Sequence, residues 1–187
     1  MSSLIDTVSQ QLSGDTLSQM SQRIGADPGA VQNAVSVALP MLLGGLAQNA
    51  SHPQGAHALD QALEQDHDGS VLDDVQSVVS NPTAFSGSGI LGHIFGGRQA
   101  PVTEGVSRAS GLNQQQVMQL LIMLAPLIMG ALGRMKRQQG VSTGGLGGIL
   151  QQQRTQAEER APGIRDILGA VLGGSQGGGT LGGLFGR

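Results

Sequence analysis

The residues best suited to chemistry form an acidic stretch that begins at Glu64. A calcium loop of the EF-hand type takes oxygen ligands at its first, third, fifth and twelfth positions and glycine at its sixth. Glu64, Asp66 and Asp68 match the first three of these positions, and Gly69 matches the sixth. The twelfth position is Val75 instead of a bidentate glutamate, so we expect calcium affinity to be weak or absent. The alternative is an acidic loop whose side chains cap the next helix.

Histidine offers a second route to a metal site. Asp66, His67, Asp68 and His93 together could form a mixed set of ligands, although no two histidines show the close His-x3-His spacing. His93 lies in an apolar run, and the alternative is that it is partly buried and hydrogen-bonded. A carboxylate of the acidic stretch would then be its structural partner.

Motifs for nucleophilic or phosphate chemistry are missing. Ser88 stands between two glycines, but its surroundings predict a loop instead of the strand, turn and helix of a nucleophile elbow. No glycine-rich segment is followed by the Gly-Lys-Ser or Gly-Lys-Thr of a phosphate-binding loop. We therefore expect a non-catalytic protein, with no cofactor and no small-molecule substrate.

Composition narrows the function classes further. The 187 residues include three Phe, no Trp and no Tyr, so the core must be aliphatic. The chain also has almost no aromatic side chains on which nucleic-acid bases could stack. The net charge is −3, and no basic stripe stands out, which argues against nucleic-acid binding. There is no Cys and no basic, apolar leader at the start of the chain, which predicts a cytoplasmic location without disulfides.

Apolar residues recur at helical spacing along most of the chain, and no stretch alternates with the period of a strand. Asp27 followed by Pro28, and Asn113 with Gln116 three residues later, are typical of helix N-termini. The helices we predict cover residues 3–12, 15–24, 28–48, 56–65, 71–80, 90–95, 102–110 and 113–138, and residues 81–89 form a loop.

Two segments match when the chain is shifted by 86 residues. Ser21, Gly25, Val31, Pro40, Gly44 and Leu46 fall on Ser107, Gly111, Val117, Pro126, Gly130 and Leu132. Each copy has a short helix, a glycine stop, an N-cap and a long apolar helix with a late proline, which predicts a kink or break there. The spacing of Ser21, Gly25 and Val31 also occurs in DNA-binding helix-turn-helix motifs. The long helix of each copy, which would have to enter the DNA groove, is however too apolar to contact bases and phosphates. We expect two copies packed on each other.

An ordered set of motifs resembles the YidB-like family of bacterial domains of unknown function. The set comprises Gly-Ala-Asp-Pro from residue 25, Ala-Leu-Pro-Met-Leu-Leu-Gly-Gly-Leu from 38, Asp-His-Asp-Gly from 66, Ile-Leu-Gly-His-Ile-Phe-Gly from 90, Ser-Gly-Leu from 110 and Leu-Ala-Pro-Leu from 124. The resemblance covers residues 4–137 and implies a multihelical fold. It implies no activity, cofactor or catalytic residue.

Residues 117–133 contain Gln119 as their one polar side chain, and Arg134, Lys136 and Arg137 follow. This pattern suits either a membrane-associated helix with a basic anchor or a core helix that is apolar on all sides. The stretch is shorter than the roughly 20 residues that span a bilayer, and it holds a central proline. Peripheral membrane association is therefore an alternative to a core helix.

Glycine is concentrated at the end of the chain, where 15 of the 31 glycines lie at or after position 140. We therefore predict an all-α, multihelical bundle with an internal pseudo-duplication of helix-turn-helix units over residues 1–138, followed by a glycine-rich, partly helical tail over 139–187. Short apolar clusters broken by glycine recur in this tail, and their candidate partner-binding residues are Ile167, Leu168, Leu181, Leu184 and Phe185. Such clusters suit docking on a protein partner or on another copy. The alternatives are a tail that folds back on its own core and a linker without a role.

Overall fold

The computed structural model describes residues 4–12, 14–65, 69–141, 143–160 and 169. All regular structure in this part of the chain is helical, so the predicted all-α class is confirmed. The elements are α1 (Leu4–Gln11), α2 (Asp15–Ile24), α3 (Pro28–Ala50), α4 (Pro53–Gln65), η1 (Ser70–Leu72), α5 (Val75–Ser80), η2 (Pro82–Phe85), α6 (Gly87–Phe95), η3 (Gly96–Arg98), α7 (Gln99–Ser110), α8 (Gln114–Gln139) and α9 (Thr143–Arg160).

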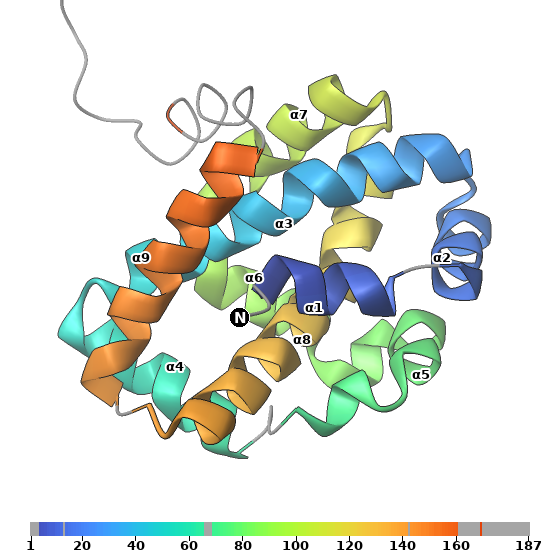
Figure 1. The fold of residues 1–187 in the computed structure, drawn as a ribbon. Coiled ribbons are helices and arrows are strands. Elements are labelled where there is room, and N and C mark those ends of the chain that lie inside the picture. Colours follow the sequence, from blue (N-terminus) through green and yellow to red (C-terminus); the bar gives the residue numbers. More distant parts are fainter. Residues whose placement is uncertain (1–3, 13, 66–68, 142, 161–168, 170–187) are drawn as a thin grey trace, which may run out of the picture.

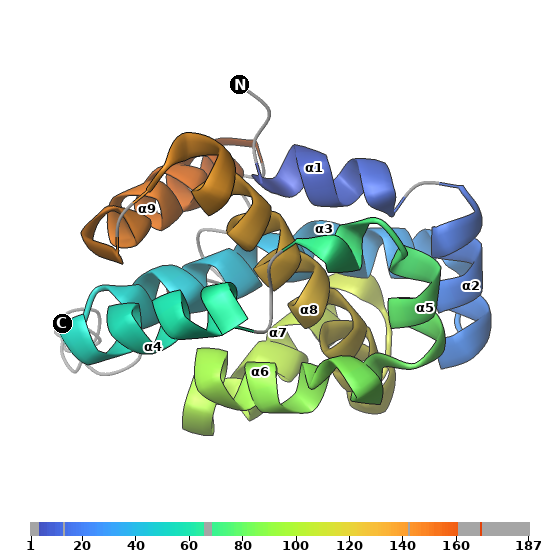
Figure 2. The same cartoon turned by 90° about the horizontal axis from the view of Figure 1, so that it is seen from below.

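The two long apolar helices, α3 and α8, pack against each other and form the centre of the fold. Figures 1 and 2 show α8 running through the middle of the molecule, with α1 and α9 over one side and α6 and α7 over the other. Their side chains are buried over most of their length, including Leu42 on α3 and Leu124 on α8. Two helices that are covered on nearly all sides explain why their sequences lack a polar face.

The predicted helix ends are confirmed at both long helices. The Asp27 carboxylate accepts hydrogen bonds from the amides of Gly29 and Ala30, at 2.8 and 3.3 Å, and starts α3. Asn113 and Gln116 form a reciprocal capping box at the start of α8. These bonds use amide donors that have no partner inside the helix.

The turns before α3 and α8 share their local contacts. Gly25 and Gly111 both adopt left-handed backbone angles, with φ of 63° and 79°. The Ser21 hydroxyl donates to the carbonyl oxygen of Ala26 at 3.0 Å, and the Ser107 hydroxyl donates to that of Leu112 at 2.5 Å. Ser21 and Ser107 are 86 residues apart, and so are Ala26 and Leu112. These contacts therefore favour the repeat that the sequence predicts.

The helices continue through their prolines, so the break that we allowed for at these positions is wrong. Pro40 lies inside α3 and Pro126 lies inside α8. A helical proline leaves the carbonyl four residues earlier without its amide donor. For Pro126 this carbonyl belongs to Ile122, and the first residue of α6, Gly87, lies directly against it: a Cβ at Gly87 would be 2.2 Å from the Ile122 oxygen.

Two segments differ from the expected elements. Residues 81–89 contain η2 and the start of α6 in place of a simple loop. Beyond the predicted boundary at 138, α9 packs along α3, and its Leu146 and Leu150 are fully buried. The Gln153 side chain accepts a 2.7 Å hydrogen bond from the amide of Leu4, which ties α9 to the start of α1. The packed core therefore extends through at least part of the segment that the sequence assigns to the tail.

Candidate functional site

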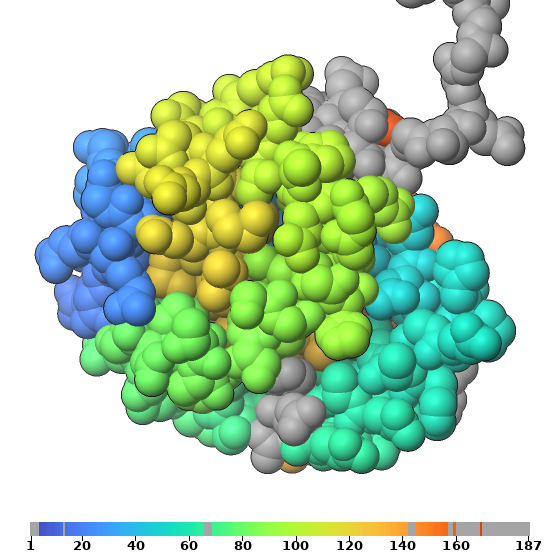
Figure 3. Space-filling model, turned by 180° about the vertical axis from the view of Figure 1, so that it is seen from behind, coloured from blue at the N-terminus to red at the C-terminus, as the bar shows by residue number. Residues whose placement is uncertain are grey.

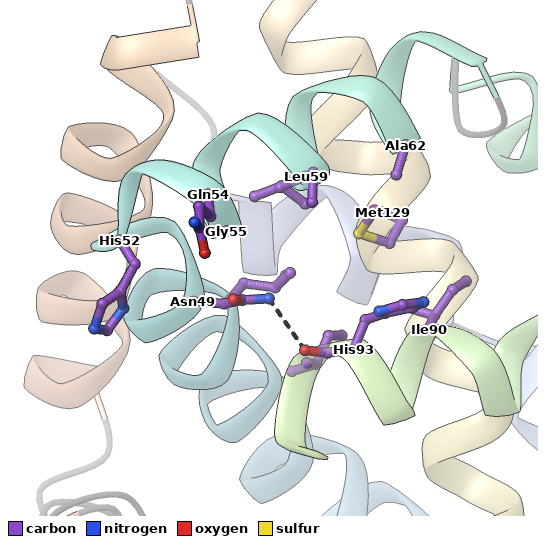
Figure 4. Close-up of a pocket in the computed structure, with 12 residues that line it drawn as sticks. Asn49, His52, Gln54, Gly55, Leu59, Ala62, Ile90, His93 and Met129 are labelled. Atoms are coloured by element: carbon purple, nitrogen blue, oxygen red, sulfur yellow. Dashed lines mark hydrogen bonds between the residues drawn. The ribbon is translucent and has the colours of Figure 1, made fainter.

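An apolar groove of about 610 Å³ lies between α4 and α6. Figure 4 shows α4 along one side of the groove and α6 along the other, with Met129 of α8 at one end of the floor. Its lining residues are Leu46, Asn49, His52, Gln54, Gly55, Ala58, Leu59, Ala62, Ile90, His93, Ile94 and Met129. Cavities of this size with mostly apolar walls and a few polar groups are the usual form of small-molecule and peptide sites.

Glycines on α3 and α4 set the walls of the groove. A Cβ at Gly45 would lie 2.6 Å from Cγ2 of Ile94 and 2.8 Å from Cε1 of Phe95, so α6 packs on α3 at the bare glycine. A Cβ at Gly55 would lie 2.1 Å from the carbonyl oxygen of Asn49, so α4 turns back closely on the end of α3. The Asn49 side chain then donates a 3.1 Å hydrogen bond to the carbonyl oxygen of His93 (Figure 4), which joins α3 to α6.

The polar groups of the groove form no acid–base arrangement among the described residues. His93 is exposed, so the prediction of a partly buried residue is wrong; its backbone, not its ring, holds the hydrogen bond from Asn49. The His52 ring lies 3.2 Å from the carbonyl oxygen of Gln48, at the far end of the groove. No carboxylate lines the groove beside either imidazole. The groove therefore combines nearly buried apolar side chains with exposed polar ones, His52, Gln54 and His93.

The candidate metal ligands Asp66, His67 and Asp68 lie outside the described residues. No group of three or more His, Asp or Glu side chains comes together in the described part of the chain. Glu64, the first position of the calcium-loop pattern, instead forms an ion pair with Lys136 at 2.8 Å.

The later positions of the calcium-loop pattern, from Gly69 to Val75, have structural roles in the fold. Val75, at the twelfth position, is buried. Gly69 has a φ of 94°, and its carbonyl oxygen accepts a 2.9 Å hydrogen bond from Arg134. Asp74 caps α5, and hydrogen bonds from the hydroxyl and amide of Ser77 lower the pKa of its carboxyl group.

The basic end of α8 is held by acidic residues of α4 and the segment before α5. Lys136 forms ion pairs with Asp60 and Glu64, and Arg134 pairs with Asp73 at 2.6 Å. The side chains of Lys136 and Asp60 are each only 12% exposed. Desolvation lowers the pKa of Lys136, but hydrogen bonds to Asp60 and Glu64, with the charges of both, outweigh it and raise the pKa. The Arg134 and Lys136 side chains are thus engaged in ion pairs within the fold.

We expect Lys136→Met to lower the free energy of unfolding by about 1–2 kcal/mol at neutral pH, because it removes the ion pair between Lys136 and the buried Asp60. The raised pKa of Lys136 fixes the pH range in which its ion pairs stabilise the folded state. This stabilisation is complete below the unfolded-state pKa of about 10.4 and is lost as pH rises through the pKa of the folded state. Urea unfolding between pH 7 and 11 measures both the loss of stability and its dependence on pH. Glu64→Gln is the matched control and should change stability by less than about 0.5 kcal/mol, because the Glu64 side chain is 66% exposed. A difference between wild type and Lys136→Met that grows towards pH 11 would contradict this account.

Two described helices, α3 and α8, are long and apolar enough to cross a membrane, judged by length and composition alone. In each, 78% of the apolar window is buried within the fold. The core helix of a soluble protein gives the same result. The burial of residues 117–133 therefore favours the core interpretation of this stretch over the membrane interpretation.

A second hollow of about 450 Å³ lies where α8 reaches the surface between α2 and η2. Its lining residues are Arg23, Pro82, Thr83, Gln119, Ile122 and Met123. Figure 3 shows this face, with the early part of α8 visible beside α6 and α7. The tail candidates Ile167, Leu168, Leu181, Leu184 and Phe185 lie outside the described residues, so the structure does not place them against either hollow.

Sequence reasoning missed the groove. Its two walls come from segments 28 or more residues apart, from Ala62 at the end of α4 to Ile90 on α6. A weak signal was present: Gly55, Ala58 and Ala62 give α4 a stripe of small residues on the groove side, where a longer side chain would fill the space.

Fold and site together define a class: an all-α helical domain with an apolar groove and, among its described residues, no metal cluster. The chain belongs to a family of bacterial proteins of unknown function, DUF937, whose model matches residues 6–135. This membership confirms the resemblance found in the sequence. The match begins in α1 and ends within α8, so α9 lies outside it. No curated protein and no solved structure matches the chain.

Proposed function

We propose that the protein is a non-catalytic interaction or scaffolding protein of the bacterial cytoplasm. Its binding elements are the apolar clusters that follow α9, with Ile167, Leu168, Leu181, Leu184 and Phe185 as contact residues. These clusters dock on a protein partner or on another copy of the chain.

The observation that carries the proposal is the recurrence of apolar clusters in the sequence after the last described core residue, Leu150. Among the described residues, the buried apolar side chains of the core run from Leu4 to Leu150, the last two of them on α9. Two further apolar clusters nevertheless follow, each with Leu or Ile beside glycine. Short apolar segments on a glycine-rich connection are suited to docking in grooves of other proteins.

The polar chemistry of the described residues also supports a binding role. Two titratable groups with shifted pKa values, Asp74 and Lys136, are occupied by a helix cap and by ion pairs. Neither lines the groove between α4 and α6. Active sites usually place such groups in a cleft, where they perform acid–base chemistry.

Light scattering behind a sizing column tests the proposal. The variant Leu181→Asp, Leu184→Asp, Phe185→Asp keeps the full chain and removes the last apolar cluster of the tail. We expect the wild type to exceed the monomer mass in a concentration-dependent way and the variant to elute as a monomer. Detection is by refractive index, because the chain has no Trp and no Tyr. Equal masses above that of the monomer would show that association does not use this cluster.

A further inference from the structure

The tail repeats a segment that already has a structural role in the fold. Residues 181–186 read Leu-Gly-Gly-Leu-Phe-Gly, and residues 91–96 read Leu-Gly-His-Ile-Phe-Gly. Four of the six positions are identical, and a fifth exchanges Ile94 for Leu184. Two of the three Phe residues of the chain stand at the same position of these two segments.

In residues 91–96, the apolar positions that both segments share are the ones that dock α6 onto the long helices. Leu91, Ile94 and Phe95 are 1%, 4% and 3% exposed. Ile94 and Phe95 reach the bare backbone of Gly45 on α3, and Gly96 ends α6 with a φ of 54°. The matching residues Leu181, Leu184 and Phe185 therefore carry the side chains that fit the surface of α3 and α8.

The groove offers more of that same surface, directly beside α6. Leu46 follows Gly45 on α3, and Leu46 and Met129 both line the groove. From α4, the groove is faced by Ala58 and Ala62, whose short side chains allow a peptide to approach closely. An apolar segment that lies between two helices over an apolar floor is a common mode of peptide recognition.

The connection is long enough to bring the segment to the groove of its own molecule. Residues 161–180 separate the end of α9 from the segment. A chain of 20 residues has an extended reach of about 66 Å. A domain of this size has a radius of gyration of about 15 Å. Because the ends are tethered, the effective concentration is on the order of millimolar.

We propose that the groove between α4 and α6 binds residues 181–186 of the same chain, with Leu181, Leu184 and Phe185 between Ala58 and Ala62 of α4 and Ile90 of α6. This inference rests on the proposed function only in taking the tail cluster as the binding element. It adds a regulated state, because a segment held in the groove cannot at the same time bind a partner.

A single Trp tests the proposal, because the chain has none. Phe185→Trp in the full chain places a fluorescent side chain in the segment. We expect its emission to lie at shorter wavelength than in the urea-unfolded protein, since the indole is buried in the groove. At protein concentrations too low for association, adding Ala58→Glu, at an exposed position on the groove wall, should shift the emission to the unfolded value. Ala100→Glu, on the exposed start of α7 and away from the groove, is the matched control and should leave the emission unchanged.

Emission that is the same with and without Ala58→Glu would overturn the proposal, as would emission at the unfolded value in the single variant. Emission that moves to shorter wavelength only at high protein concentration would overturn docking within one chain. The light-scattering experiment tests the proposed function separately from these fluorescence measurements. If both inferences hold, Ala58→Glu raises the associated fraction, because it releases the segment.

Discussion

Leu150→Ala should lower the free energy of unfolding by about 2–5 kcal/mol, although residue 150 lies in a segment that the sequence assigns to a glycine-rich tail. Leu150 is 0% exposed on α9, which packs along α3. Truncating a buried leucine removes apolar contacts and leaves a cavity that the surrounding helices fill only in part. Urea unfolding followed by far-ultraviolet circular dichroism measures the change.

Gln151→Ala is the matched control for this prediction. Gln151 is the next residue on α9 and is exposed, so its truncation should change stability by less than about 0.5 kcal/mol. A small and equal effect of both substitutions would mean that α9 adds nothing to the stability of the core.

Gly87→Ala is expected to cost about 3 kcal/mol, at the upper end of the usual range for overpacking. The added Cβ would lie 2.2 Å from the carbonyl oxygen of Ile122 and 2.9 Å from its Cγ2 atom. A side chain could rotate away, but this oxygen is fixed in the backbone of α8, so α6 would have to move. The same unfolding experiment gives the magnitude, and a loss of α6 packing would also expose Phe95.

Gly89→Ala provides the contrast on the same helix. No atom lies within 4 Å of a Cβ at Gly89, and alanine is a better helix former than glycine, so we expect a gain of about 0.5–1 kcal/mol. Opposite signs at positions 87 and 89 would support close packing of α6 on the carbonyl that Pro126 leaves without a donor. Two small stabilising effects would show that α6 is not held there.

Local chemistry made the helix ends predictable from the sequence. Asp27 with Pro28, and Asn113 with Gln116, act on amides within three residues, so no tertiary information is needed to recognise them. The glycine stops at 25 and 111 are equally local, because their left-handed backbone angles favour glycine.

Tertiary packing decides the features that could not be predicted. The glycines at 144, 145, 147 and 148 indicate a flexible tail by composition, yet α9 begins at Thr143 and runs through them. A Cβ at Gly147 would lie 3.3 Å from the carbonyl oxygen of Ala50, so one of these glycines permits a close approach of helices. The exposure of His93 likewise depends on how α4 and α6 are spaced over α3, which no local pattern encodes.

Chemical cross-linking in the producing cell tests the central claim, tail-mediated protein interaction, most directly. The full chain is compared with the full-length variant Leu181→Asp, Leu184→Asp, Phe185→Asp, expressed to the same level, and Gln151→Ala serves as the control. We predict cross-linked species, with another copy or with a protein partner, in the wild type and in Gln151→Ala and their loss in the triple variant. An unchanged set of cross-linked species in the triple variant would contradict the account.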